Sequence, residues 1–299
     1  MEEPLEQEAT TPRAAVSEEY RQEIASWQEN RAKGLTRETG WLTLTGLFWL
    51  EEGENSVGSA PDADVRLPED KALPSVGRLV LREGEVTLVS APDSGVVVDG
   101  QPVTSVAMQP DVSGEPTIAE VGPVQFYVIH RGDRIGVRVR DREHPARTTF
   151  AGLDYFPIDP EWRVTARLEP YDPPKQIPIQ NIVGIVEPLP SPGALVFEVD
   201  GKEYRLDPIL EEGSDELFVI FADQTSGKET YPAGRYMYAA VPGPDGTTVL
   251  DFNKAYNPPC AFTEFATCPL PPRQNRLDVR IDAGEKVYHA PEQPAVAGR

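Results

Sequence analysis

Runs of alternating apolar and polar residues, separated by turn residues, recur along most of this chain and limit the folds open to it. Residues 76–90 read VGRLVLREGEVTLVS, and residues 195–206 read LVFEVDGKEYRL. A period of two places alternate side chains on opposite faces of a strand, and the Glu-Gly and Asp-Gly pairs supply the positive φ of a tight hairpin. The 31 prolines and 24 glycines are spread along the chain without repeats. The sequence therefore predicts a mainly β fold built from antiparallel sheets.

The length of 299 residues suits one large domain or two ordinary ones, and we expect two. We predict a disordered acidic tail over residues 1–16 and an N-terminal helix with a small β-sandwich over 17–118. A larger antiparallel β sheet or barrel domain is expected over 119–290, followed by a short tail over 291–299. The hairpin about Arg131-Gly132-Asp133 belongs, on this reading, to the larger domain.

One stretch near the N-terminus has a helical period. Ser17 can cap a helix whose first turn carries Glu18 and Glu19, and Tyr20, Ile24 and Trp27 then recur at spacings of four and three. We expect the helix to end at Gly34 and to pack against the sandwich. Two further tryptophans that follow it, Trp41 and Trp49, are interpreted as core residues.

The net charge of the chain limits the classes of molecule that it can bind. The formal net charge is −21 at pH 7, and a surface this acidic repels the phosphates of nucleic acids and anionic lipids. We therefore expect no nucleic acid partner. The same acidity is also a common adaptation for solubility at high salt, so it does not identify a ligand.

The N-terminal residues bear on the compartment. No stretch of the chain approaches the roughly 18 consecutive apolar residues of a membrane span. Residues 1–12, MEEPLEQEATTP, lack the basic and apolar regions of a signal peptide. An acidic start of this kind resembles the tether that follows a removed secretion signal. This favours an extracytoplasmic compartment, with a cytoplasmic one as the alternative.

Residues 55–103 resemble a forkhead-associated domain, a β-sandwich that opens with Gly-Arg, continues with Ser-x-x-His and closes on Asn-Gly. The corresponding positions here are Gly58-Ser59, Ser75-Val-Gly-Arg78 and Asp99-Gly100. The arginine and histidine that serve the phosphopeptide site are absent, and a bound phosphate needs such charge-assisted donors. The resemblance implies a sandwich that could contact proteins, without phosphothreonine binding.

Three polar clusters follow predicted strands in the C-terminal half, at residues 221–236, 250–272 and 274–286. If these strand ends meet at one rim, their side chains converge, and convergent polar groups in a pocket are the default hypothesis for a site. Alternatively, Asp, Asn, Thr and Ser in turns bond their own backbone, and arginines pair with nearby glutamates. The candidate ligand-binding residues are Asp223, Glu229, Tyr231, Arg235, Asn253, Tyr256, Asn257, Asn275 and Arg276.

Three longer runs resemble one known family. They read DFNKAYNPPCAFTEFATCPLPPRQNRLDVRIDAGEK, DQTSGKETYPAGRY and GWLTLTGLFWLEEGENSVGS, and together they are similar to the domain-of-unknown-function family 1684. The resemblance covers nearly the whole chain, and the asparagine, proline and cysteine run is its most specific part. The family carries no established activity, so the resemblance implies a fold and no reaction.

The only two cysteines, Cys260 and Cys268, lie within a proline-rich stretch. A disulfide would close a small loop, stabilise the fold by about 2–3 kcal/mol and require an oxidising compartment. In a reducing compartment both would be buried thiols or metal ligands, although zinc wants about four ligands and the chain has three histidines and no Cys-x-x-Cys. A catalytic thiol would need a histidine base, and the sequence places none nearby. We favour the disulfide and predict no metal and no cofactor.

Three functions remain open, and the sequence does not decide whether the protein is an enzyme. The favoured one is a module that binds a small polar or sugar-like ligand at the polar rim. The second is a hydrolase that uses a carboxylate pair from Asp223, Glu229 and Asp251, which in glycosidases would lie about 5–10 Å apart. A serine route through Ser226 lacks a recognised motif and a nearby histidine. The third is a structural or protein-interaction scaffold.

Overall fold

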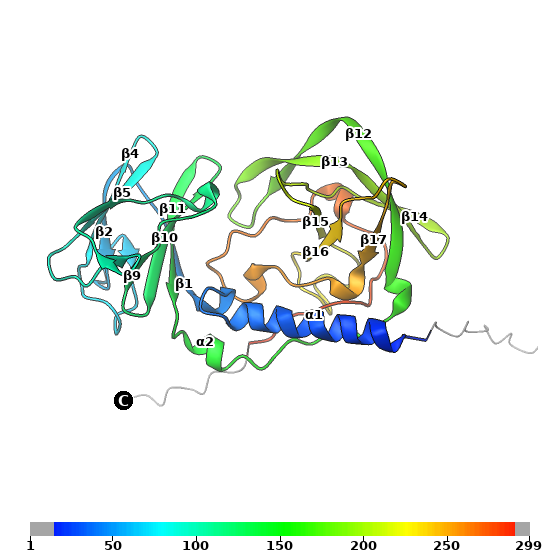
Figure 1. Ribbon diagram of the computed structural model, residues 1–299, viewed down its shortest axis with the longest axis horizontal. Helices are drawn as coiled ribbons and strands as arrows, with labels where there is room; N and C mark the ends of the chain where they lie inside the picture. The colour runs from blue at the N-terminus through cyan, green and yellow to red at the C-terminus, as the bar shows by residue number, and fades with distance from the viewer. Residues whose placement is uncertain (1–14, 291–299) are drawn as a thin grey trace, which may run out of the picture.

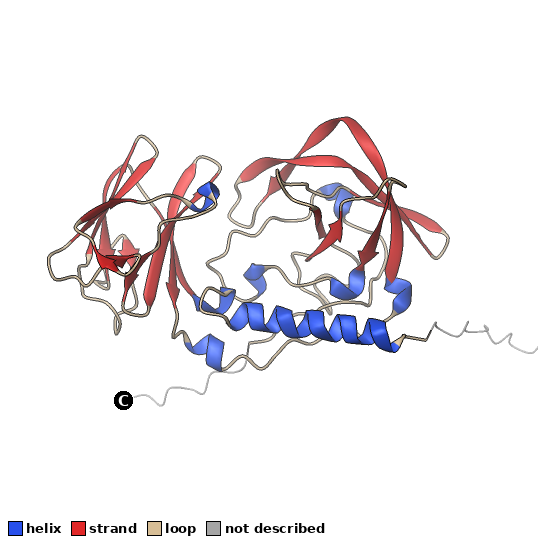
Figure 2. Ribbon diagram, viewed as in Figure 1, coloured by secondary structure: helices blue, strands red, loops and turns tan. Residues whose placement is uncertain are grey.

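The computed structural model describes residues 15–290, so the predicted tails lie outside it apart from residues 15 and 16. The described chain is mainly β with a long helix near its N-terminal end, which confirms the predicted fold class (Figures 1 and 2). Among these residues, no helix has the length and apolar character that crossing a membrane requires.

Two sheets form a β-sandwich in the N-terminal half. The strand order is β1-β11-β10-β9-β6-β7 in the first sheet and β3-β2-β4-β5-β8 in the second. Apolar side chains that alternate along the strands, including Val57, Leu79, Leu88 and Phe126, are buried between the sheets. The strands are β1 (Leu44–Trp49), β2 (Gly53–Gly58), β3 (Val65–Arg66), β4 (Gly77–Arg82), β5 (Glu85–Ser90), β6 (Val97–Val98), β7 (Gln101–Pro102), β8 (Ser105–Ala107), β9 (Ala119–Val121), β10 (Val124–Arg131) and β11 (Arg134–Asp141).

Strands β9, β10 and β11 are placed differently from our expectation. They lie in the range assigned to the C-terminal domain, yet β11 pairs with β1 and β9 pairs with β6. Their inward residues, such as Phe126, Val137 and Val139, fill the core of the sandwich. Alternation predicts that a strand exists, but it does not specify which sheet the strand joins. The division of the chain into domains remains a prediction.

The C-terminal half is a curled sheet around a smaller one. The outer sheet has the order β14-β13-β12-β17, and β15 and β16 form a separate pair. The long strands β12 and β13 arch over β15 and β16 (Figure 1), and Leu195, Phe197, Phe221 and Phe252 are buried in the core of this half. The strands are β12 (Arg163–Gln180), β13 (Val186–Val199), β14 (Lys202–Leu206), β15 (Glu216–Phe221), β16 (Arg235–Ala240) and β17 (Thr247–Asp251).

Strands β16 and β17 are consecutive but do not form a ladder with each other. Within residues 15–290, the strand partner of β16 is β15 and that of β17 is β12. The two strands lie close enough for Thr248 Oγ1 to donate a hydrogen bond to the carbonyl of Ala240 at 2.8 Å. The facing edges of the two strands therefore lie beside each other without a ladder, and the edge of β16 is paired at Tyr236, which bridges to Tyr256.

The long helix α1 (Glu18–Thr36) covers the open side of the curled sheet (Figure 1). Ser17 caps it as predicted, since the hydroxyl accepts a bond from the Tyr20 amide at 3.2 Å. The helix continues two residues beyond Gly34, and its buried side chains are Ile24 and Leu35.

The position of α1 corrects our expectation that it would pack on the sandwich. Tyr20 Oη donates to Asp251 at 2.8 Å, and Arg31 Nε donates to Glu285 at 2.8 Å. Both partners belong to the C-terminal half. The helix contacts segments more than 200 residues away because polar partners for one of its faces are available there. A second, short helix, α2 (Pro145–Thr148), lies in the connection between the halves.

Candidate functional site

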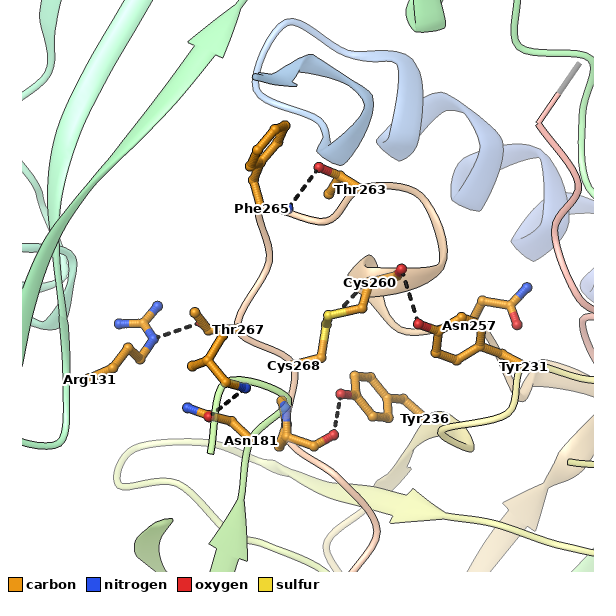
Figure 3. The surroundings of a disulfide bond; sticks show 12 residues. Arg131, Asn181, Tyr231, Tyr236, Asn257, Cys260, Thr263, Phe265, Thr267 and Cys268 are labelled. Carbon is orange, nitrogen blue, oxygen red and sulfur yellow. Dashed lines mark hydrogen bonds between the residues drawn. A yellow bond between two sulfur atoms is a disulfide. The ribbon is translucent and has the colours of Figure 1, made fainter. Parts of the chain in front are cut away.

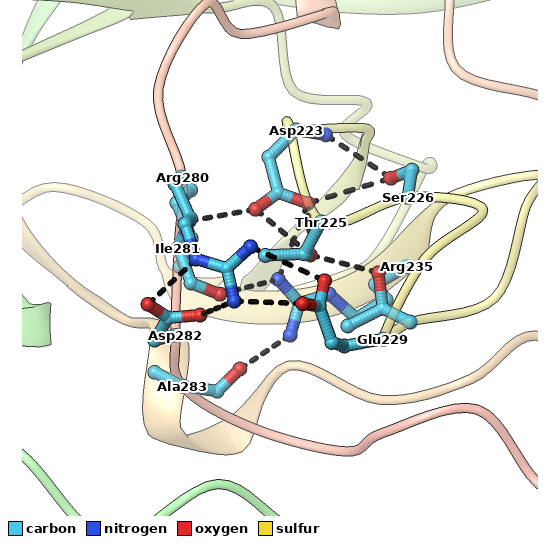
Figure 4. Close-up of polar contacts among 10 residues, drawn as sticks. Asp223, Thr225, Ser226, Glu229, Arg235, Arg280, Ile281, Asp282 and Ala283 are labelled. Carbon is cyan, nitrogen blue, oxygen red and sulfur yellow. Dashed lines mark hydrogen bonds and ion pairs between the residues drawn. The ribbon is translucent and has the colours of Figure 1, made fainter.

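The first predicted polar cluster contains a buried ion pair (Figure 4). Arg235 is fully buried, and its Nη2 lies 3.4 Å from Asp223 Oδ1. Asp223 also accepts bonds from Thr225 Oγ1 at 2.8 Å and from the Ile281 amide at 2.7 Å. Arg235 donates to the carbonyls of Ile281 and Ala283. These bonds hold the last part of the described chain against β16 and leave neither side chain facing solvent.

Two other members of the predicted rim lie at the surface. Glu229 pairs with Arg280 at 3.0 Å, and the two side chains are 39% and 43% exposed. Arg276 is exposed as well. Neither residue lines the cleft described below.

The three predicted asparagines are buried and connect distant segments. Asn253 Nδ2 donates to the Asp159 carbonyl at 2.8 Å, and its Oδ1 accepts from the Asp159 amide at 3.0 Å. Asn275 makes the same two bonds to Asp207, at 2.9 and 2.8 Å. Asn257 is also fully buried. A side-chain amide carries both a donor and an acceptor, so it can replace a neighbouring strand for one residue of irregular chain.

A buried ion pair that the sequence did not indicate joins α1 to the C-terminal segment. Glu285 is fully buried, and its Oε1 lies 2.8 Å from Arg31 Nε. Its other oxygen accepts a bond from the Asn257 amide at 2.8 Å. Burial raises the pKa of Glu285, while the Arg31 guanidinium and the Asn257 amide oppose that rise. The two charged residues are 254 positions apart, so no local pattern could reveal the pair.

Cys260 and Cys268 are joined by a disulfide, the alternative that we favoured (Figure 3). The predicted rim residue Tyr231 donates its hydroxyl to the Cys260 carbonyl at 3.1 Å. Tyr236 donates to the Pro269 carbonyl at 2.6 Å. Two tyrosines thus hold the two ends of the cysteine loop.

The same loop touches the sandwich and the helix. Thr267 Oγ1 accepts bonds from Arg131 Nε at 3.2 Å and from Arg138 Nη2 at 3.3 Å. On the other side, the ring of Phe262 lies 5.5 Å from the Arg31 guanidinium. The loop therefore bridges the sandwich and α1.

A cleft opens beside α1, and it contains few of the residues predicted from the sequence. It consists of two adjoining cavities of about 660 Å³ and 430 Å³ that share Trp27, Tyr238 and Tyr256. The larger cavity is lined by β16 and β17, and the smaller one reaches Trp41 and Phe218. We refer to both cavities together as the α1 cleft.

Aromatic rings form one wall of the α1 cleft. The ring of Tyr238 stacks on that of Phe218 with centroids 5.1 Å apart, and on that of Tyr256 with centroids 6.3 Å apart. Trp27 of the helix lies 6.5 Å from Tyr256. Tyr238 is 52% exposed, so part of this aromatic wall is open to a ligand. Burial raises the pKa of Tyr238 and of Tyr256 above the ordinary value of 10.0, so their hydroxyls stay protonated into the alkaline range.

Charged groups line the end of the α1 cleft next to the N-terminus of the helix. Asp251 Oδ1 accepts the Tyr20 hydroxyl at 2.8 Å. Asp251 Oδ2 lies 3.8 Å from Lys254 Nζ and 3.9 Å from Arg163 Nε. Burial raises the pKa of Tyr20, and its bond to Asp251 acts in the same direction. This end of the cleft offers two cations beside a carboxylate.

The structure therefore does not bring the predicted site residues together in one place. Of the nine ligand candidates, Tyr256 lines the α1 cleft, and of the three carboxylates considered for catalysis, Asp251 does. Sequence reasoning missed Tyr238 and Trp27, and it assigned Trp41 to the core. Tyr238 follows the buried Tyr236 by two positions, and a second tyrosine on the same face of a strand was the available signal.

Two side chains at the positions that resemble a forkhead-associated domain bond to other residues of the sandwich. Arg78 Nε lies 3.1 Å from Glu54, and Ser59 Oγ donates to the Ala72 carbonyl at 2.9 Å. These contacts account for both side chains without a ligand.

Comparison with known proteins gives a family and several structural relatives. Residues 148–286 match the family described as "Protein of unknown function (DUF1684)". The match is shorter than the resemblance that we expected, and it does not include the run at residues 40–59. An uncharacterised protein of Haloarcula marismortui, solved by NMR, has 33% identity, covers 47% of this chain and 78% of its own, and has a TM-score of 0.40. A phosphothreonine-dependent FHA domain has 18% identity over 31% of this chain and 92% of its own, with a TM-score of 0.23. The FhaA FHA domain, complexed with the intracellular domain of Rv3910, has 19% identity over 31% of this chain and 97% of its own, with a TM-score of 0.23. The search of curated proteins found no match.

Proposed function

We propose that this chain, which belongs to the DUF1684 family of proteins of unknown function, binds a small polar ligand in the α1 cleft. The observation that supports the proposal is the exposed aromatic wall around Tyr238, which lies in the same cleft as Arg163, Lys254 and Asp251. A ligand pocket commonly combines apolar and aromatic side chains with a few convergent polar groups. Sugars and short peptides both present an apolar face together with hydrogen-bonding groups.

Binding is better supported than hydrolysis. Asp223 is occupied by Arg235 in the interior, and Glu229 pairs with Arg280 at the surface. Asp251 is then the one carboxylate of the three candidates in the α1 cleft, and the other carboxylate that lines this cleft, Glu216, was not among them. The predicted carboxylates therefore do not form the pair that flanks the substrate of a glycosidase. A protein partner for the sandwich remains a prediction.

Thermal unfolding in the presence of a panel of ligands tests the proposal. The panel contains neutral mono- and disaccharides, nucleosides, amino acids and capped short peptides. A ligand present at about 100 times its Kd stabilises the folded state by about 2.7 kcal/mol, which raises Tm by roughly 5–10 °C for a chain of this size. We expect at least one class to produce such a shift.

Two variants locate the effect. Tyr238→Ala removes the exposed ring and should abolish the shift, and Tyr238→Phe should keep most of it. Glu229→Gln lies outside the cleft and serves as the matched surface control. The proposal is wrong if no class shifts Tm, or if Tyr238→Ala responds as strongly as the unmodified protein.

A further inference from the structure

We infer that the ligand of the α1 cleft is a short peptide in an extended conformation, bound through its main chain to the unpaired edges of β16 and β17. The inference rests on the proposed function, because it names the ligand class for the same cleft.

The main chain of β16 has free hydrogen-bonding groups on the side of the cleft. Tyr236 exchanges two main-chain bonds with Tyr256, at 2.9 and 2.8 Å, and Val241 donates to Asp215 on the opposite side at 3.1 Å. Successive residues of an antiparallel strand direct their main-chain groups to opposite sides. The amide and carbonyl of Tyr238 therefore point away from β15, on the side of the strand where Tyr256 pairs. The amide of Ala240 points the same way.

Strand β17 also has main-chain groups that point away from its partner strand β12 and toward β16. Leu168 donates to the Gly246 carbonyl at 2.9 Å, and the register continues with Ala166 opposite Thr248. Residues 246, 248 and 250 therefore direct their main-chain groups toward β12. The amide and carbonyl of Val249 point the other way, toward β16, and Val249 lines the cleft.

Both ends of this open stretch are closed by the protein itself. At the turn, the Thr248 hydroxyl satisfies the Ala240 carbonyl at 2.8 Å. At the other end, Tyr256 occupies the edge of β16 at Tyr236. The free edge groups are thus the amide and carbonyl of Tyr238, the amide of Ala240, and the main-chain groups of Val249 and Asp251 that point away from β12. So short a stretch suits a ligand of a few residues.

Side chains beside the free edges support the same ligand class. Tyr238, Val241 and Val249 are 52%, 42% and 39% exposed, respectively. An exposed apolar strand edge is normally avoided because it pairs with other chains. When a peptide adds to a strand edge, main-chain bonds give affinity and alternate side chains give specificity. A sugar could stack on Tyr238, but it would not reproduce the donor and acceptor spacing of the two edges.

The probes are capped tetrapeptides in which Thr alternates with Val, Leu, Tyr, Lys or Glu. Their binding to the full chain is measured by calorimetry. The best binder is then compared with two derivatives, each N-methylated at one alternate pair of residues. N-methylation removes the amide donors on one edge of the peptide. Since a hydrogen bond contributes about 1 kcal/mol, we expect at least one derivative to bind roughly 5–30-fold more weakly.

A matched pair of variants tests the protein edge. Val249→Pro removes the amide that faces the cleft and leaves the ladder with β12 intact, as proline is tolerated when its nitrogen faces away from a paired strand. Val249→Ala keeps that amide and shortens the side chain. We expect peptide binding to Val249→Pro to be roughly 5-fold weaker than to Val249→Ala. Circular dichroism shows whether both variants are folded. If the proline variant is unfolded, binding of the methylated peptides to the unmodified protein tests the inference instead.

The outcomes separate this inference from the proposed function. If a saccharide or nucleoside binds in a Tyr238-dependent manner and no peptide does, the cleft binds ligands but the peptide inference is wrong. Equal affinity of both methylated peptides and the parent peptide would also overturn the inference. If no class binds at all, the proposed function and the inference are both wrong.

Discussion

Buried polar side chains hold the irregular segments of the C-terminal half in place. Asn253 and Asn275 each bond both main-chain groups of one distant residue, and Asp223 with Arg235 binds residues 281–283. A buried polar group that loses its partner is costly because water cannot replace it. These side chains were reasonable candidates for a site because interior cross-links and ligand sites use the same residue types.

The contrast between a buried and an exposed ion pair gives a direct prediction. Arg235→Met should lower the free energy of unfolding by about 3–5 kcal/mol, because it leaves the Asp223 carboxylate buried without its cation. Glu229→Gln breaks the exposed pair with Arg280 and should leave the unfolding midpoint unchanged within error. Urea denaturation of both variants measures the difference. Equal effects of the two substitutions would contradict the structural role of Arg235.

His144 gives a prediction for pH. Burial lowers the pKa of this imidazole, with Asp141 opposing the effect, and neutral Nδ1 accepts the Ala146 amide at 3.3 Å at the start of α2. The unfolded chain, with a pKa near 6.5, takes up the proton more readily than the folded chain. The stability that His144 contributes is therefore present above pH 6.5 and lost as the pH falls through its lower folded pKa.

The measurement for His144 is the unfolding midpoint as a function of pH. His144→Asn keeps a capping acceptor and does not titrate, so the unmodified protein should lose stability relative to this variant as the pH is lowered from about 7.5 to about 5. Parallel curves for the two proteins would show that His144 is not the responsible group.

At the scale of elements, the helix α1 and the cysteine loop link parts of the chain that are far apart in sequence. Arg31 pairs with Glu285, and its guanidinium lies 4.7 Å from the ring centre of Tyr256 in the cleft. The cysteine loop contacts β10 and β11 through Thr267 and lies beside the helix through Phe262. The cleft is therefore shaped by elements that each depend on the others for their position.

The disulfide should contribute measurably to stability. It joins residues eight positions apart, and closing so small a loop is expected to stabilise the fold by about 2–3 kcal/mol. The double variant Cys260→Ser with Cys268→Ser should lose this amount in urea denaturation. Treatment of the unmodified protein with dithiothreitol should give the same midpoint as the double variant, which itself should not respond to the reagent. The expectation is wrong if the unmodified protein, unfolded and refolded in dithiothreitol, keeps the same urea midpoint as without the reagent.

At the scale of the whole molecule, the net charge of −21 acts on every element at once. Repulsion among like charges destabilises a compact state, and salt screens it by shortening the Debye length from about 30 Å at 0.01 M to about 8 Å at 0.15 M. We expect Tm to rise over this range of NaCl and to rise equally in KCl. A fall in Tm would mean that the surface ion pairs contribute more than the repulsion.

The features that could be predicted from the sequence are local ones: the strands, the tight turns, and the helix with its cap. The period of two predicted the strands. The turn residues Glu83, Asp99 and Asp200, each of which directly precedes a glycine, have the positive φ expected of a tight hairpin. The helical spacing and the cap at Ser17 predicted α1. These features follow from the preferences of neighbouring residues, which a sequence displays directly.

Long-range contacts determine which elements meet. The tertiary structure placed β9 to β11 in the sandwich and α1 on the C-terminal sheets, and it brought Trp27 and Tyr238 into one cleft while burying Asn253. Strand edges, helix faces and polar side chains each have many possible partners that satisfy the same local preferences. The choice among them depends on packing and hydrogen bonding summed over residues hundreds of positions apart, and that sum is not visible in any single stretch of sequence.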